Sequence, residues 1–328
     1  MSCRWKARSA DSAVVRSVID TNGNQLVNRR EHRAVADVLI SSVLFAGCNI
    51  AWRYGSGPAI SIVGFRVAMG AIVAVLISRR QHAGSWREPL RVRTGRIAVG
   101  VQVVGLVAAG TMFRTLDGPL AGLALACTPA VALLVRDRAG RFSTLAALGS
   151  SLAAIIGLTV AAGGDGVDTV TWAGAAIAVA FVAIEVIGLR TSEVAVEDGV
   201  NPTTIVSSTM ISGSIILLPM GLAFGTLQQP WTIWGALGAA IAVALFGTIG
   251  RVLRTAALPA AGVTAVAASS QINALFTAIG GVLLLNDSVT LVSLVCTVAA
   301  AALGATAVVS AARWRLSRKP DLGLALDS

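Results

Sequence analysis

Apolar residues fall in ten long runs along the chain, and short polar segments separate each run from the next. A run of about 20 apolar residues is long enough to cross the hydrocarbon core of a bilayer as a helix. We therefore predict an all-α polytopic membrane protein, because the alternating polarity of a transmembrane barrel is missing. The ten predicted transmembrane helices cover about residues 34–53, 58–78, 97–116, 119–135, 143–162, 170–189, 202–224, 231–250, 258–285 and 289–311.

A nine-residue pattern, Arg-Thr-x-x-x-Pro-x-Ala-Gly, occurs at residues 114–122 and again at residues 254–262. Each copy joins the end of one apolar run to the start of the next, which indicates a duplicated half. Because each predicted half has an odd number of helices, the second half must enter the membrane from the opposite face. Such inverted repeats are typical of alternating-access transporters, whose substrate site lies near the bilayer midplane. The predicted parts are a tail at 1–33, a first five-helix repeat at 34–162, an inverted repeat at 170–311 and a tail at 312–328.

Composition and charge favour the same membrane location. Only 13% of the residues are charged and the mean hydropathy is +0.78, whereas soluble proteins carry about 25% charged residues. The net charge of +10 does not indicate a nucleic-acid partner, because 23 of the 26 Lys and Arg residues fall on one predicted side of the membrane. This asymmetry predicts a multi-pass protein of the cell inner (plasma) membrane with both termini in the cytoplasm. The count places Arg251 and Arg254 in a cytoplasmic loop, and we interpret Arg114 and Arg254 as rim and orientation residues.

Three segments of the chain are distinctive: Ala-Gly-Cys-Asn-Ile-Ala-Trp at 46–52, the segment from Pro58 to Arg66, and the closing hairpin from Ala267 to Val309. Together they resemble the EamA-like ten-helix transporters of the drug/metabolite transporter (DMT) superfamily. The short Arg-Asp-Arg link at 136–138 is similar, more narrowly, to the threonine/homoserine exporters of that superfamily. The resemblance implies a secondary transporter that exports a small polar metabolite, such as an amino acid, by alternating access. Its site would be lined by predicted helices one to four and six to nine.

No motif indicates an enzyme, a cofactor or a metal. The chain lacks the Gly-x-x-x-x-Gly-Lys-Ser/Thr pattern of phosphate-binding loops. His32 and His82 lie in predicted cytoplasmic segments, and the four cysteines are not closely spaced. We therefore expect no catalytic residue, no cofactor and no metal site.

Two ionisable residues stand inside predicted helices, where a charge is costly and usually faces a cavity or a partner. Arg66 is a candidate anchor for a substrate carboxylate or phosphate, since the planar guanidinium matches such groups. Glu185 is a candidate proton-coupling residue. The alternatives are that Arg66 ties helix ends together, and that Glu185 sits at the cytoplasmic interface near Arg190.

Polar residues at central positions of other apolar runs complete the candidate substrate site. Gln271 and Asn273 lie near the middle of the run at 258–285, where amides either bind substrate or join helices. Thr128 precedes Pro129, which interrupts helical hydrogen bonding at the matching place in the first half. Further candidates for the cavity wall are Asn49 and Gln102.

Two other functions are consistent with the sequence. Arg53, Arg66 and Arg114 toward the outer side would suit a flippase for a lipid or lipid-linked sugar, with a laterally open groove. The chain could also be a membrane subunit that binds a partner and transports nothing, although intramembrane polar residues argue against this. The expected partners are a small-molecule substrate and the lipid bilayer, and the sequence leaves a homodimer open.

Overall fold

The computed structural model describes residues 29, 31–51, 59–115, 118–135, 140–162, 172–224, 233–285 and 290–318. Every regular element in these ranges is a helix. They are an N-terminal helix (Glu31–Ala51), α2 (Ala59–Arg80), α3 (Glu88–Arg91), α4 (Arg93–Thr115), α5 (Gly118–Ala132), the 3₁₀ turn η1 (Leu133–Val135), α6 (Arg141–Ala162), α7 (Trp172–Glu197), α8 (Pro202–Phe224), α9 (Ile233–Ala261), α10 (Val263–Ala268), α11 (Ser270–Leu285) and α12 (Leu291–Arg318).

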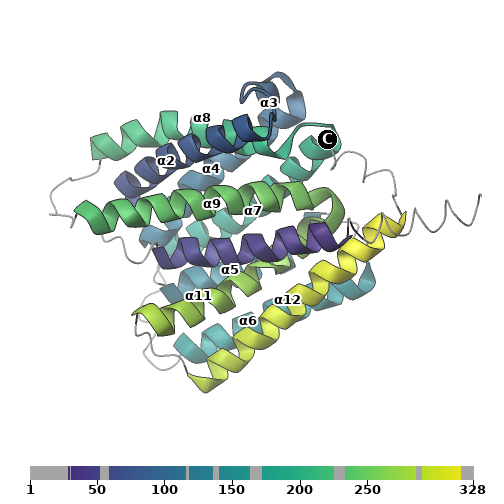
Figure 1. Cartoon of the computed structure of the whole chain (residues 1–328). Coiled ribbons are helices and arrows are strands. Elements are labelled where there is room, and N and C mark those ends of the chain that lie inside the picture. Colours follow the sequence, from purple (N-terminus) through teal and green to yellow (C-terminus); the bar gives the residue numbers. More distant parts are fainter. Residues whose placement is uncertain are drawn as a thin grey trace, which may run out of the picture.

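Five helical segments of this described part are long and apolar enough to cross a membrane. The long helices run side by side in one bundle (Figure 1). The most extensive contacts join α2 to α8, α6 to α12, and α4 to α7. Figure 1 shows α2 and α8 at one edge of the bundle, α6 and α12 at the other, and α9 and the N-terminal helix between them.

Alanines are frequent in the interior of the bundle, and many large apolar residues lie on its outside. One interior cluster consists only of alanines: Ala146, Ala147, Ala268 and Ala307. Large apolar side chains are exposed along α6 and α12, namely Phe142, Leu145, Leu148, Leu152, Ile156, Leu291, Val292, Leu294, Val295 and Val298. This distribution is typical of helices that pack closely through small residues and face lipid with large ones. The chain is a polytopic α-helical membrane protein.

The predicted loop at 251–257 is wrong, because α9 continues without interruption to Ala261. Arg251 and Arg254 therefore lie on a helix. The predicted helix at 258–285 is instead divided into the end of α9, the fully buried α10, and α11. The break falls at Gly262, whose φ of +85° strongly favours glycine.

The two copies of the repeated pattern consequently differ in local structure. In the first copy, α4 ends at Thr115 and α5 begins at Gly118. In the second copy, the helix runs past the proline and ends just before the glycine. The shared sequence thus does not specify one shared backbone conformation.

A buried ion cluster joins three helices beside this break. The Glu193 side chain on α7 is fully buried and pairs with Arg190 and with Arg315 of α12. Arg315 also donates a hydrogen bond to the carbonyl oxygen of Pro259 on α9, at 3.4 Å. Glu193 is therefore the ion-pair partner of Arg190, and Glu185 pairs with Arg254 instead.

Candidate binding cavity

A cavity of about 200 Å³ lies within the bundle. Its walls come from the N-terminal helix, α2, α4, α5, α7, α8, α9 and α11, and none of the described side chains of α6 or α12 lines it. The lining residues are Ser41, Ser42, Phe45, Cys48, Asn49, Arg66, Val67, Gly70, Gly105, Leu106, Leu125, Thr128, Phe181, Glu185, Met210, Val243, Ala244, Gly247, Thr248, Arg251, Arg254, Ser269, Ser270 and Asn273.

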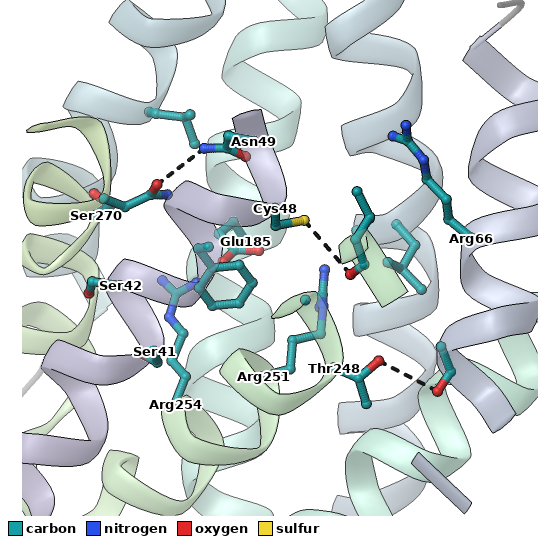
Figure 2. Close-up of a pocket in the computed structure, with 18 of the residues that line it drawn as sticks. Ser41, Ser42, Cys48, Asn49, Arg66, Glu185, Thr248, Arg251, Arg254 and Ser270 are labelled. Carbon is teal, nitrogen blue, oxygen red and sulfur yellow. Dashed lines mark hydrogen bonds and ion pairs between the residues drawn. The ribbon is translucent and has the colours of Figure 1, made fainter. Parts of the chain in front are cut away.

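Three arginines and one carboxylate give the cavity its charge. Arg66 comes from α2, and Arg251 and Arg254 come from α9 (Figure 2). Arg251 and Arg254 lie three residues apart, so they share one face of the helix. The side chains that line the cavity therefore carry a formal charge of +3 from arginines and −1 from Glu185.

Glu185 holds one of these arginines in an ion pair. Arg254 Nη1 lies 2.8 Å from Glu185 Oε1, and both side chains are partly buried. The guanidinium carbon of Arg254 also lies 5.7 Å from the ring centroid of Phe45, within the range of a cation–π contact. Arg254 is therefore oriented by α7 and by the N-terminal helix together.

A second part of the cavity wall is made of amides. Asn49 Nδ2 on the N-terminal helix donates to Asn273 Oδ1 on α11 at 3.2 Å. Thr277 Oγ1 donates to the same oxygen at 3.1 Å. These hydrogen bonds join the start of the chain to α11 and fix the direction of both amides.

Two hydroxyl groups of the cavity wall have no hydrogen-bond partner among the described residues. They are Thr128 Oγ1 on α5 and Ser270 Oγ on α11. Thr128 is only 1% exposed. Pro129, next to it inside α5, cannot donate to the carbonyl oxygen of Leu125, which also lines the cavity. This side of the cavity thus offers polar atoms that a bound molecule could satisfy.

The structure brings five of the seven predicted site residues together on the cavity wall: Asn49, Arg66, Thr128, Glu185 and Asn273. Gln102 and Gln271 do not line it. Gln102 donates to Ser192 at 2.6 Å and accepts from Thr209 at 3.2 Å, so it joins α4 to α7 and α8. Gln271 is 2% exposed and donates to the carbonyl oxygen of Ala126 at 3.4 Å, so it joins α11 to α5.

Sequence reasoning missed the role of Arg251 and Arg254. Two charges after an apolar run suggested a loop, and Arg254 was interpreted as a rim residue. A signal was present in the chain, because no proline or glycine stands between Arg251 and Leu258 to end the helix. The side chain of Arg114, the counterpart of Arg254 in the repeated pattern, lies outside the described residues.

The described residues contain no group of three or more His, Cys, Asp or Glu side chains placed to hold a metal ion. The lining residues instead combine fixed positive charge, amides and hydroxyl groups. Such a set binds and orients a small polar molecule.

Comparison with known proteins identifies the second half of the chain. Residues 172–310 match the EamA-like transporter family. This half is an EamA-like transporter domain. No curated protein matches the sequence. Twenty-one solved chains match the structure. One, described only as a crystal structure of a protein, superimposes with a TM-score of 0.68 over 86% of this chain and 98% of its own, at 14% identity. That likeness shows the fold alone.

The EamA-like domain supplies three of the four charged residues among the described residues that line the cavity. It begins at α7 and extends into α12, so Glu185, Arg251, Arg254 and Asn273 belong to it. Arg66, on α2, lies outside it. The cavity therefore requires both parts of the chain.

Proposed function

We propose that the chain is a secondary active transporter of the DMT type, which exports a small polar metabolite by alternating access. The observation that carries the proposal is the charged cavity shared by the EamA-like domain and the helices before it. Charges within a membrane-embedded bundle are costly and usually mark a substrate pathway.

The cavity suits a molecule of amino-acid size. Its volume of about 200 Å³ is below the range of about 300–1,000 Å³ typical of sites for drug-sized ligands. An arginine can bind a carboxylate in a bidentate manner. Ser270 and Thr128 offer hydroxyl oxygen atoms that can accept hydrogen bonds from an ammonium or hydroxyl group.

Helix pairing supports alternating access between two inverted halves. With ten transmembrane helices, α2 and α8 would be the second helices of their halves, and α6 and α12 the fifth. These are two of the three most extensive pairs. Pairing of equivalent helices is expected when a two-fold axis relates the halves.

The ion pair of Glu185 and Arg254 supports proton coupling. A substrate carboxylate and the Glu185 carboxylate would compete for the same guanidinium. Protonation of Glu185 would free Arg254 for the substrate, so binding of the substrate and of a proton would favour each other.

Transport by purified protein in liposomes tests this function. Vesicles loaded with a panel of labelled amino acids should release at least one faster than protein-free vesicles. A labelled phospholipid in the same vesicles should not change leaflet faster. Folded protein that releases no member of the panel but moves the phospholipid would replace the transporter proposal with a flippase.

A further inference from the structure

We propose that the groove between α6 and α12 binds a phospholipid with an anionic head group from the surrounding membrane. The groove is lined by Phe142 of α6 and by side chains of α12 between Ala305 and Ser317, and its volume is about 750 Å³. Figure 1 shows both helices at one edge of the bundle. None of the described lining residues is shared with the central cavity, so the inference concerns a second site and does not depend on the proposed transport function.

Two contacts place the start of α6 beside the end of α12. Ser143 Oγ donates a hydrogen bond to the carbonyl oxygen of Ala307 at 3.0 Å. A Cβ added to Gly140 would lie 3.1 Å from Trp314 Cδ1, so the indole packs directly against the backbone at this point. The two helices are therefore antiparallel, and the first turn of α6 and the last turns of α12 form the same end of the groove.

Polar groups gather at that end of the groove and apolar groups further along it. Arg313 and Trp314 belong to the last turns of α12, whereas Ala305 and Val309 lie further from its end. Thr306 lies among the apolar residues, and its hydroxyl donates to a carbonyl oxygen of its own helix at 2.8 Å. Tryptophan is enriched at the head-group level of membranes. The groove thus has the polarity of a lipid, with a polar end and an apolar continuation.

The length of the groove matches one leaflet. Residues 305–317 rise about 18 Å along a helix axis. One leaflet contributes half of a hydrocarbon core that is about 30 Å thick. Leu145, which is 67% exposed, extends the apolar wall along α6. A single lipid therefore fits with its head group beside Arg313 and an acyl chain beside Val309.

Basic residues at the polar end of the groove favour an anionic head group. The side chain of Arg313 is 69% exposed, and its Nε donates to Glu31 Oε1 at 2.7 Å. A guanidinium has five N–H donors, so this contact orients Arg313 and uses one of them. Arg141 is exposed at the start of α6, and α12 ends at Arg318, one turn beyond Trp314. Arginine matches a phosphate group, and clustered basic residues at a membrane surface attract anionic lipids.

The same residues argue against a second copy of the chain as the occupant. Two copies in one membrane would meet across a two-fold axis, so each would present this patch to the other. The basic ends of both grooves would then face one another, and like charges across an interface are unfavourable. A lipid supplies the opposite charge.

Native mass spectrometry of the full-length purified protein tests the inference. The probes are phosphatidylglycerol and phosphatidylcholine with identical acyl chains, added at equal concentration. We expect the protein to retain phosphatidylglycerol at least fivefold more than phosphatidylcholine. Equal retention of the two lipids would overturn the proposal.

Substitutions locate the bound lipid. Arg141→Gln and Arg313→Gln should each lower the retention of phosphatidylglycerol at least threefold. Thr306→Trp fills the groove at an exposed position and keeps every charge, so it should lower retention as well. Arg79→Gln is the control, because it removes an exposed charge from the end of α2, at the opposite edge of the bundle (Figure 1). Folded Arg141→Gln and Thr306→Trp proteins that retain the lipid like the unmodified protein would overturn the proposal.

Two further results would assign the groove to another occupant. A dimer that forms without added lipid and is dissociated by Thr306→Trp would show that a second copy covers this face, and would overturn the lipid assignment. Glycerol 3-phosphate that displaces phosphatidylglycerol at equal concentration would show that the groove binds a free anion, and would also overturn it. Retention of phosphatidylglycerol by the monomer, unaffected by glycerol 3-phosphate, would support the lipid.

Discussion

Glu185 decides whether Arg254 is held in an ion pair at the cavity wall. Its carboxylate holds Arg254 at 2.8 Å, and Arg251 lies one helical turn away on the same face. An uncharged side chain at 185 would release Arg254 from this ion pair. Under the proposed function, the affinity for substrate and the response to protons would both depend on Glu185.

Glu185→Gln should abolish the dependence of transport on a pH gradient while leaving substrate exchange intact. Glutamine cannot exchange a proton, and its amide oxygen pairs only weakly with Arg254. The measurement is uptake in liposomes with and without an imposed gradient, beside counterflow exchange at equal pH. A variant that responds to the gradient like the unmodified protein would remove Glu185 from coupling.

Thr128→Val should weaken substrate binding severalfold without lowering the stability of the empty protein. The substitution keeps the shape of the side chain and removes a buried hydroxyl that lacks a partner. An unsatisfied buried group costs about 1–3 kcal/mol, so the melting temperature of the empty protein should stay equal or rise.

Thr209→Val is the matched control for this prediction. Thr209 on α8 is fully buried, but its hydroxyl lies within hydrogen-bond distance of two acceptors, the carbonyl oxygen of Ile205 and Gln102 Oε1. Removing it should lower the melting temperature and leave the affinity of the folded protein unchanged. The reverse pattern in the two variants would show that Thr128 acts in packing.

At the scale of elements, the break between α9 and α10 positions the second half of the cavity. It lets α9 carry Arg251 and Arg254 while α11 carries Ser270 and Asn273 to the same space. Gly262 makes the break possible, since its φ is +85° and a Cβ there would lie 2.7 Å from Arg315 Cζ.

Gly262→Ala should reduce the free energy of unfolding by about 1–3 kcal/mol, because a side chain is strained in this backbone region. Displacement of Arg315 would also disturb its pair with Glu193. Thermal unfolding in detergent measures the effect. Gly100→Ala is the control, because that site is an exposed helical position with nothing within 4 Å of the added Cβ. If Gly100→Ala lowered the free energy of unfolding as much as Gly262→Ala, the explanation would be contradicted.

The sequence predicted the helical elements better than their ends. The helix at 202–224 was placed at the bounds that α8 has. Helices α7 and α9 continue past the predicted ends, and ion pairs hold charged residues of both continuations. Glu193 pairs with Arg190 and Arg315, and Arg254 pairs with Glu185. Hydropathy treats each charged residue as a cost, so it ends a helix where tertiary pairing lets it continue.

At the scale of the whole molecule, the candidate site depends on contacts that no local pattern contains. Asn49 and Asn273 are 224 positions apart, yet their amides share a hydrogen bond. The cost of polar groups in a membrane identified both as candidates. The same cost identified Gln102 and Gln271, which join helices outside the cavity. Only the packing of the bundle separates the two outcomes.

The distribution of small and large residues predicts different effects of substitutions in the interior of the bundle and on its exposed surface. Ala147→Leu should destabilise the bundle by about 1–3 kcal/mol through overpacking, because Ala147 is fully buried among other alanines. Leu152→Ala on the same helix should change stability little, since Leu152 is 61% exposed. Melting temperatures in one detergent compare the two. Equal losses would show that the exposed face of α6 is covered in the native assembly.

The placement of Arg66 and Arg251 on different helices gives an occupant a mechanical effect. A substrate that contacts both side chains would link α2 to α9 for as long as it is bound. One of these helices lies outside the EamA-like domain and the other within it. Binding of a substrate should therefore slow amide hydrogen exchange in α2 and α9 together, although the two helices are far apart along the chain.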